Sequence, residues 1–259
     1  MRIEAILFVN WIFWAGLSAG TLLVVGLAEL LGGTTRGYRL FMAWLLVGLA
    51  AILVASELAL PLGVEAAATA DLRRPLIFVF AGGCAGYLVA SIANWPRAWL
   101  AIGTGVVGLA ALVVLAAAGG SRSAPLFAGQ LILAALALGA VNAAMLLGHW
   151  YLVTPKLSPL PLRRMMWLLI GLLVLQGVAF ATALVGVGTE VLDGGIGWLT
   201  WLRLVAGILL PILIGVLAIL ASRAASLQAS TGLLYIGLAL IMAGSIAGSS
   251  ITYLTGIPV

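Results

Sequence analysis

The sequence predicts an all-α, polytopic integral membrane protein, built as a bundle of about eight transmembrane helices. The first observation is composition, since 64% of the residues are hydrophobic and only 7% are charged, whereas a soluble domain has about 25% charged residues. The second is that the apolar runs are continuous and about 20 residues long, which excludes the alternating strands of an outer-membrane barrel. Because the loops are short, we expect residues 1–259 to form a single transmembrane helical domain.

Eight apolar runs are long enough to cross about 30 Å of hydrocarbon as helices that rise about 1.5 Å per residue. Short segments rich in Gly and Pro separate them, as expected for turns. The third run is the shortest. The predicted spans are residues 5–31, 40–62, 76–93, 98–118, 126–153, 165–187, 198–221 and 232–254.

The distribution of Lys and Arg predicts the orientation. With eight spans both termini lie on one side, and the loops on the other side carry more of the basic residues, which favours the cytoplasm for those loops. We therefore expect a protein of the bacterial plasma (inner) membrane with both termini outside, surrounded by lipid, and we assign the net charge of +5 to topology rather than to nucleic acid. The seven basic residues predicted inside are Arg36, Arg39, Arg97, Lys156, Arg163, Arg164 and Arg223, and the four predicted outside are Arg2, Arg73, Arg74 and Arg122.

Metal-ligating residues are scarce. Cys84 is the only cysteine and His149 is the only histidine. This excludes a disulfide within the chain, a set of thiolates for zinc or an iron–sulfur cluster, and a haem held by two histidines of this chain. We predict that the chain alone binds no metal and no haem.

Glu57 is a carboxylate inside the apolar run of the second span, and Arg203 is the strongly buried charge candidate in the second half of the chain; these two are the candidate catalytic residues. A charge at the centre of a bilayer costs roughly 2.5–3.5 kcal/mol on insertion scales, so each needs a partner or a polar site. Their depths match in the predicted topology, so we expect them to lie close together near the outer face, either as a structural ion pair or at a pocket where the carboxylate exchanges protons. Asn10 and Trp14 lie at the same depth and are candidate cofactor-binding residues, although Trp14 and Trp11 also suit an interfacial aromatic belt.

A second polar set is predicted near the inner face. His149 and Asn142 are seven residues apart, which places them on one face of the fifth span, and Glu29 lies near the inner end of the first. His149 and Asn142 are further cofactor-binding candidates. His149 suits an interfacial anchor, a proton entry point or one axial ligand of a haem shared with another chain.

Small residues predict where helices approach closely. Gly16 and Gly20 form one pair with the small-xxx-small spacing, and Gly82 and Gly86 form another. Pro211, inside the seventh span, predicts a kink.

Two stretches resemble the NrfD-like, or polysulfide-reductase membrane-anchor, family. FWAGLSAGTLLVVGLAELLGG at 13–33 is similar to the opening helix of that family, and DLRRPL at 71–76 is similar to its DLGRP motif, with Arg73 in place of Gly. The resemblance covers about the first third of the chain. The family's Ser-Trp-rich segment after the motif is absent.

The resemblance implies a quinone-interacting integral membrane subunit of a bacterial respiratory oxidoreductase. Such a subunit exchanges electrons and protons with menaquinone or ubiquinone near the outer face, passes electrons to an iron–sulfur or cytochrome subunit, binds no metal itself and is not catalytic alone. Two alternatives stay open: a structural or haem-anchoring subunit of a larger complex, and a small transporter. A transporter is disfavoured because the chain shows neither inverted repeats nor paired broken helices.

Overall fold

The chain folds into long helices, and a computed structural model describes residues 3–60, 64–117, 124–154, 157–187, 192 and 194–255. Eight helical segments in these ranges are long and apolar enough to cross a membrane, which confirms the predicted number. The described part of the chain contains no strand. The elements are α1 (Ile3–Leu31), α2 (Arg36–Ala59), α3 (Val64–Ala93), α4 (Ala98–Ala117), α5 (Ala124–Val153), α6 (Leu160–Val187), α8 (Gly197–Leu204), a π-helical turn (Val205–Leu209), α9 (Leu210–Arg223) and α10 (Leu227–Thr255).

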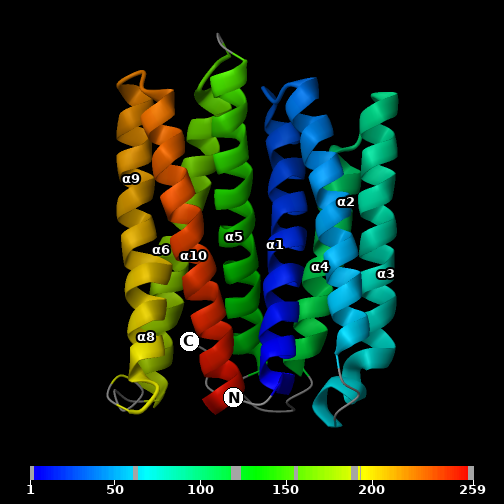
Figure 1. Cartoon of the computed structure of the whole chain (residues 1–259), viewed down its shortest axis with the longest axis vertical. Coiled ribbons are helices and arrows are strands. Elements are labelled where there is room, and N and C mark those ends of the chain that lie inside the picture. Colours follow the sequence, from blue (N-terminus) through cyan, green and yellow to red (C-terminus); the bar gives the residue numbers. More distant parts are fainter. Residues whose placement is uncertain are drawn as a thin grey trace.

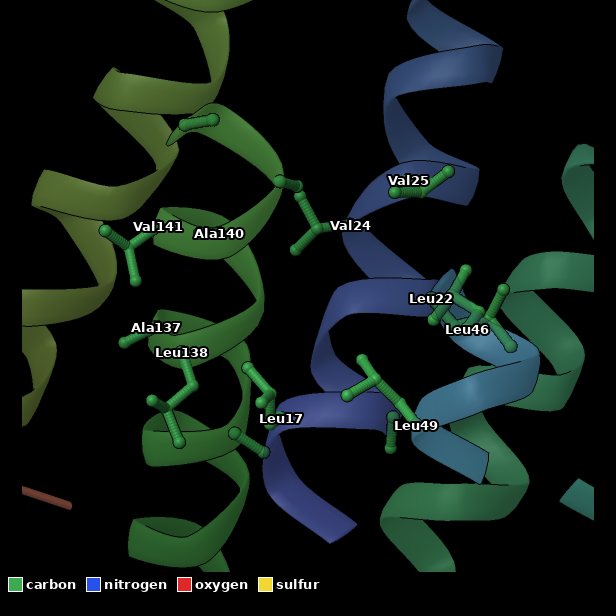
Figure 2. Packing of buried hydrophobic residues seen from close by; sticks show 14 of the residues in the cluster. Leu17, Leu22, Val24, Val25, Leu46, Leu49, Ala137, Leu138, Ala140 and Val141 are labelled. Atoms are coloured by element: carbon green, nitrogen blue, oxygen red, sulfur yellow. The ribbon is translucent and has the colours of Figure 1, made fainter. Parts of the chain in front are cut away.

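Helix α1 is the centre of the bundle. It packs against α2, α4, α5 and α10, and it is the most buried of the eight candidate spans. Figure 2 shows Leu17 and Leu22 of α1 between Leu138 of α5 and Leu46 of α2. All four side chains belong to one large apolar cluster, which extends through both halves of the chain.

The helices form two groups that meet along α1 and α5. The first group contains α1, α2, α3 and α4, and the second contains α5, α6, α10 and the span made of α8, the π turn and α9. Figure 1 shows the first group on the right and the second on the left, with the N- and C-terminal ends of the chain at the same end of the bundle. We call this the terminal end. Arg2, Arg122 and Lys156, which entered the orientation argument, lie outside the described residues.

The two groups come closest where α1 and α5 cross. A Cβ atom on Gly139 of α5 would overlap the backbone of Gly20 on α1, and a Cβ atom on Gly20 would overlap the backbone carbonyl of Ala135. This confirms the predicted packing role of Gly20, and Gly16 also faces Ala135 at van der Waals distance. Only glycine allows the two backbones to come this close.

The second glycine pair is confirmed at Gly86 but not at Gly82. A Cβ atom on Gly82 would meet nothing within 4 Å, so Gly82 is not in a helix contact. Gly83 instead packs against the side chain of Thr104 on α4, and Gly86 lies near Leu100.

Helix α3 begins earlier than predicted. It starts at Val64, where the sequence suggested an apolar span from residue 76, so the DLRRPL stretch lies inside the helix rather than in a loop. Pro75 also lies inside α3. Hydropathy predicted the start of this helix too late because three of the residues at 71–74 are charged. One of them, Arg73, is buried, and hydropathy does not include the interaction that compensates its charge.

The predicted irregularity in the seventh span is a π-helical turn. It covers Val205–Leu209, and the N–H of Leu210 donates to the carbonyl of Val205, five residues earlier. Pro211 follows at the start of α9. A proline has no N–H to continue the α-helical ladder, and a wider turn beside it is one of the known causes of kinks. Here Gly207 approaches the backbone of Gly244 on α10.

The outer surface of the bundle is apolar. Large hydrophobic side chains are exposed on most helices, among them Phe78, Val178 and Leu213. Exposed tryptophans lie near helix ends, including Trp95 and Trp99 at one end and Trp198 at the other, as in the aromatic belts of membrane proteins. A surface of this composition suits lipid rather than water.

Candidate functional site

Glu57 is bound by Arg73, not by Arg203. Glu57 lies in the last turn of α2, and its side chain is completely buried. The guanidinium of Arg73, on α3, donates from Nε to Oε2 over 2.9 Å and from Nη2 to Oε1 over 3.0 Å. This two-pronged geometry matches the planar guanidinium to the planar carboxylate and is the strongest form of such a pair.

Neighbouring side chains hold Arg73 in place. Its Cζ lies 5.3 Å from the ring centroid of Trp11, in a cation–π contact. Its Nη1 donates to Thr69 Oγ1 over 3.1 Å. Arg74 adds a second guanidinium, with its Nε 3.4 Å from Glu57 Oε1, but Arg74 is 35% exposed where Arg73 is 1% exposed. Among the described residues, one carboxylate thus faces two cations.

Trp11 is therefore not part of an interfacial belt. It is fully buried and faces Arg73, so the belt interpretation is wrong for this residue. A fully buried tryptophan supplies a polarisable face that partly replaces water around the guanidinium.

Asn10 connects this cluster to helix α1. Its amide nitrogen donates to Ser56 Oγ over 3.1 Å, and Ser56 precedes Glu57 on α2. Its amide oxygen accepts from Trp14 Nε1 over 2.9 Å. The two residues that the sequence singled out on α1 are thus bonded to each other, and Asn10 lies one residue from Trp11, which faces Arg73.

Asn10 also faces a cavity between α1 and α10. The cavity has a volume of about 240 Å³. Two of its lining residues, Ile6 and Ile246, are exposed at the bundle surface, which places the opening on the lipid-facing side. The lining is apolar apart from one amide and one hydroxyl, and consists of Ile6, Val9, Asn10, Phe13, Ile246 and Ser250.

Arg203 has a different environment, so its predicted pairing with Glu57 is wrong. It lies on α8, in the other helix group, and its Nη2 donates to Gln176 Oε1 on α6 over 3.2 Å. Gln176 in turn donates to the carbonyl of Leu133 over 2.8 Å. Two buried residues can pair only if they lie at the same depth in the membrane. Equal depth does not determine which helices are neighbours, and α2 and α8 lie in different helix groups (Figure 1).

A further ion pair lies at the end of the bundle opposite the termini. Glu29, near the end of α1, lies 3.1 Å from Arg97 Nε through its Oε2 and accepts from the hydroxyl of Tyr87 through its Oε1. The sequence placed Glu29 with His149, and Arg97 counted only as a topology signal. The sequence could have suggested this pair, because Glu29 lies near the end of the predicted span 5–31 and Arg97 directly precedes the span 98–118, which places both residues on the same side of the membrane.

His149 and Asn142 both lie on α5, but their hydrogen-bond partners lie on different helices. Asn142 is buried and donates to Thr21 Oγ1 on α1 over 3.1 Å. His149 is exposed near the end of α5, and its Nδ1 lies 3.2 Å from the hydroxyl of Tyr235 on α10. The structure does not bring them to a shared cavity among the described residues, and it favours an interfacial location for His149.

The described residues contain no group of three or more His, Cys, Asp or Glu side chains arranged to hold a metal ion. The prediction that the chain binds no metal or haem alone stays a prediction.

Comparisons of the chain with protein-family models, with curated proteins and with solved structures give no match. The resemblance to the NrfD-like family therefore stays a prediction from two stretches of sequence.

Proposed function

We propose that this protein is a quinone-interacting membrane subunit of a bacterial respiratory oxidoreductase, and that the quinone ring binds in the cavity beside Asn10. The observation that carries the proposal is that Asn10 both lines this cavity and bonds to Ser56, next to the buried Glu57–Arg73 pair. The site therefore joins a lipid-facing apolar cavity to a polar cluster at one end of the bundle.

The residues present fit a quinone. A quinone ring is flat and apolar, with carbonyl oxygens that accept hydrogen bonds, and pockets for such ligands are mainly apolar with a few polar groups that fix orientation. Val9 and Phe13 supply apolar walls, and the amide nitrogen of Asn10 carries a second proton besides the one it donates to Ser56. Menaquinone and ubiquinone both have these features.

In this proposal Glu57 and Arg73 are positioning residues. Both carboxylate oxygens of Glu57 accept hydrogen bonds from Arg73, so the pair fixes the end of α2 against α3 and places Arg73 against Trp11. Asn10 then holds its orientation because Ser56 and Trp14 bond to its amide. A bound quinone supplies the redox chemistry, and an iron–sulfur or cytochrome subunit exchanges electrons with it.

The excess of Lys and Arg in the loops on one side supports an orientation in the bacterial plasma membrane with the terminal end, and hence the cavity, outside. Reporter fusions after Val259 and within residues 154–161 test this orientation. The fusion within 154–161 is expected to be cytoplasmic and the other external, and the reverse pattern contradicts the proposed orientation.

We predict that Asn10→Leu weakens the binding of a short-chain quinone analogue by about three- to tenfold. The loss corresponds to one hydrogen bond, which contributes about 0.5–1.5 kcal/mol net. Binding is measured by titrating the analogue into the purified chain in lipid nanodiscs.

Ser56→Ala is the matched variant for this experiment. It removes one partner of the Asn10 amide without removing the amide itself, which Trp14 still holds, so we expect a smaller loss of quinone affinity than in Asn10→Leu. Thr182→Val, on the exposed face of α6, is the control for a surface polar-to-apolar change. Equal losses of affinity in Asn10→Leu and Ser56→Ala would show that Asn10 is only structural.

A further inference from the structure

The second helix group buries a cation that has no carboxylate partner among the described side chains. Arg203 is only 4% exposed. The described carboxylates with ion pairs are Glu57, bound by Arg73 and Arg74, and Glu29, bound by Arg97. Arg203 donates a hydrogen bond to Gln176, but the acceptor is a neutral amide oxygen. A guanidinium stays protonated in proteins, so this charge needs compensation from another source.

Three donors around Arg203 lack an acceptor in the part of the chain that the structure describes. There, the Nε and Nη1 of Arg203 have no hydrogen-bond partner, and neither does the buried hydroxyl of Ser245 on α10. Buried polar groups in folded proteins are almost always hydrogen-bonded, so three orphaned donors on neighbouring helices indicate a missing acceptor.

Both residues line one small cavity. It lies between α5, α8 and α10, with a volume of about 20 Å³, and its other lining residues include Gln130, Ser249 and Thr252. A cavity holds a single water molecule from about 10–15 Å³ upward, so this one accommodates a monatomic ion but not a phosphate headgroup or a quinone ring. The size of the cavity and the sign of the charge thus limit the ligand.

We propose that Arg203 and Ser245 bind a small monovalent anion, the size of chloride, inside the second helix group. The anion accepts from Arg203 Nε and Nη1 and from the Ser245 hydroxyl, and it neutralises the guanidinium. It thereby stabilises the contact between α8, α10 and α5. This site is separate from the Asn10 cavity and does not depend on the proposed quinone function.

The test is the thermal stability of the purified full-length chain in detergent, with gluconate as the starting anion and chloride added at constant ionic strength. We expect the melting temperature of the wild type to rise and saturate with chloride and with bromide, because a ligand that binds only the folded state stabilises it. Sulfate, which is too large for the cavity, is expected to give no saturable rise.

Three variants assign the effect. Arg203→Gln is expected to abolish the response, and Ser245→Ala to raise the half-saturating chloride concentration by about three- to tenfold, through the loss of one hydrogen bond. Arg223→Gln makes the same charge change at an exposed position on α9 and is expected to keep the full response. If Arg203→Gln does not fold, Ser245→Ala decides, and an unchanged half-saturation overturns the proposal.

A wild type whose melting temperature does not respond to chloride also overturns the proposal.

Discussion

Replacement of Glu57 by leucine is expected to lower the free energy of unfolding by about 3–5 kcal/mol, the usual cost of leaving one member of a buried ion pair without its partner. Arg73 is 1% exposed and would lose both of the hydrogen bonds that it donates to the Glu57 carboxylate. The measurement is reversible unfolding of the purified chain in mixed micelles.

The double variant Glu57→Leu, Arg73→Leu is expected to recover much of this loss, because removing both charges removes the uncompensated one. Arg74→Leu is the matched control, since Arg74 contacts the same carboxylate but is 35% exposed, and exposed pairs contribute about 0–1 kcal/mol. Glu57→Leu and Arg203→Leu are expected to be additive, because the two residues share no partner among the described side chains. A large coupling between Glu57 and Arg203, or an equal cost for Arg74→Leu and Glu57→Leu, would contradict the observed pairing.

Substitution of Gly139 by alanine is expected to destabilise the bundle by at least the upper end of the range of about 1–3 kcal/mol seen for overpacked cores. The added Cβ would overlap the backbone of Gly20, and a backbone cannot rotate away as a side chain does. Helices α1 and α5 would have to separate along the line where the two helix groups meet. The same unfolding assay measures the effect.

Gly82→Ala and Gly171→Ala are matched controls, because a Cβ at either position meets no atom within 4 Å. Alanine has the higher helix propensity, so these variants are expected to be neutral or more stable by up to about 1 kcal/mol. If Gly139→Ala behaves like Gly82→Ala, the close approach of α1 and α5 is wrong.

The sequence predicted the positions of the helices better than it predicted which helices pack against one another. Continuous apolar runs determined the eight candidate spans, and the glycine spacing around Gly20 correctly indicated a close crossing. The same composition identified Glu57 and Arg203 as buried charges that need compensation, which the structure confirms. These are local properties, and each follows from residues within one helix.

The partners of these charges could not be predicted, because adjacency depends on how helices pack across the bundle. Arg73 was counted as a loop residue since residues 71–74 are strongly charged, yet α3 continues through them and Glu57 compensates the buried guanidinium. A hydropathy scale assigns each residue its own transfer free energy and does not include the stabilisation of a charge by its partner. An interhelical hydrogen bond of Gln176 was expected from its place in an apolar helix, but its pairing with Arg203 could not be predicted for the same reason.

The central claim is that a quinone ring binds between α1 and α10 beside Asn10. The most direct measurement is photolabelling of the wild-type chain in native-like membranes with an azidoquinone, followed by mapping of the labelled residues. Labelling is expected to concentrate on the residues that line the cavity, and to fall when an excess of unlabelled quinone is added. These residues are Ile6, Val9, Asn10, Phe13, Ile246 and Ser250. Labelling spread evenly over the lipid-facing surfaces of α3, α6 and α9, or insensitive to unlabelled quinone, would contradict the claim.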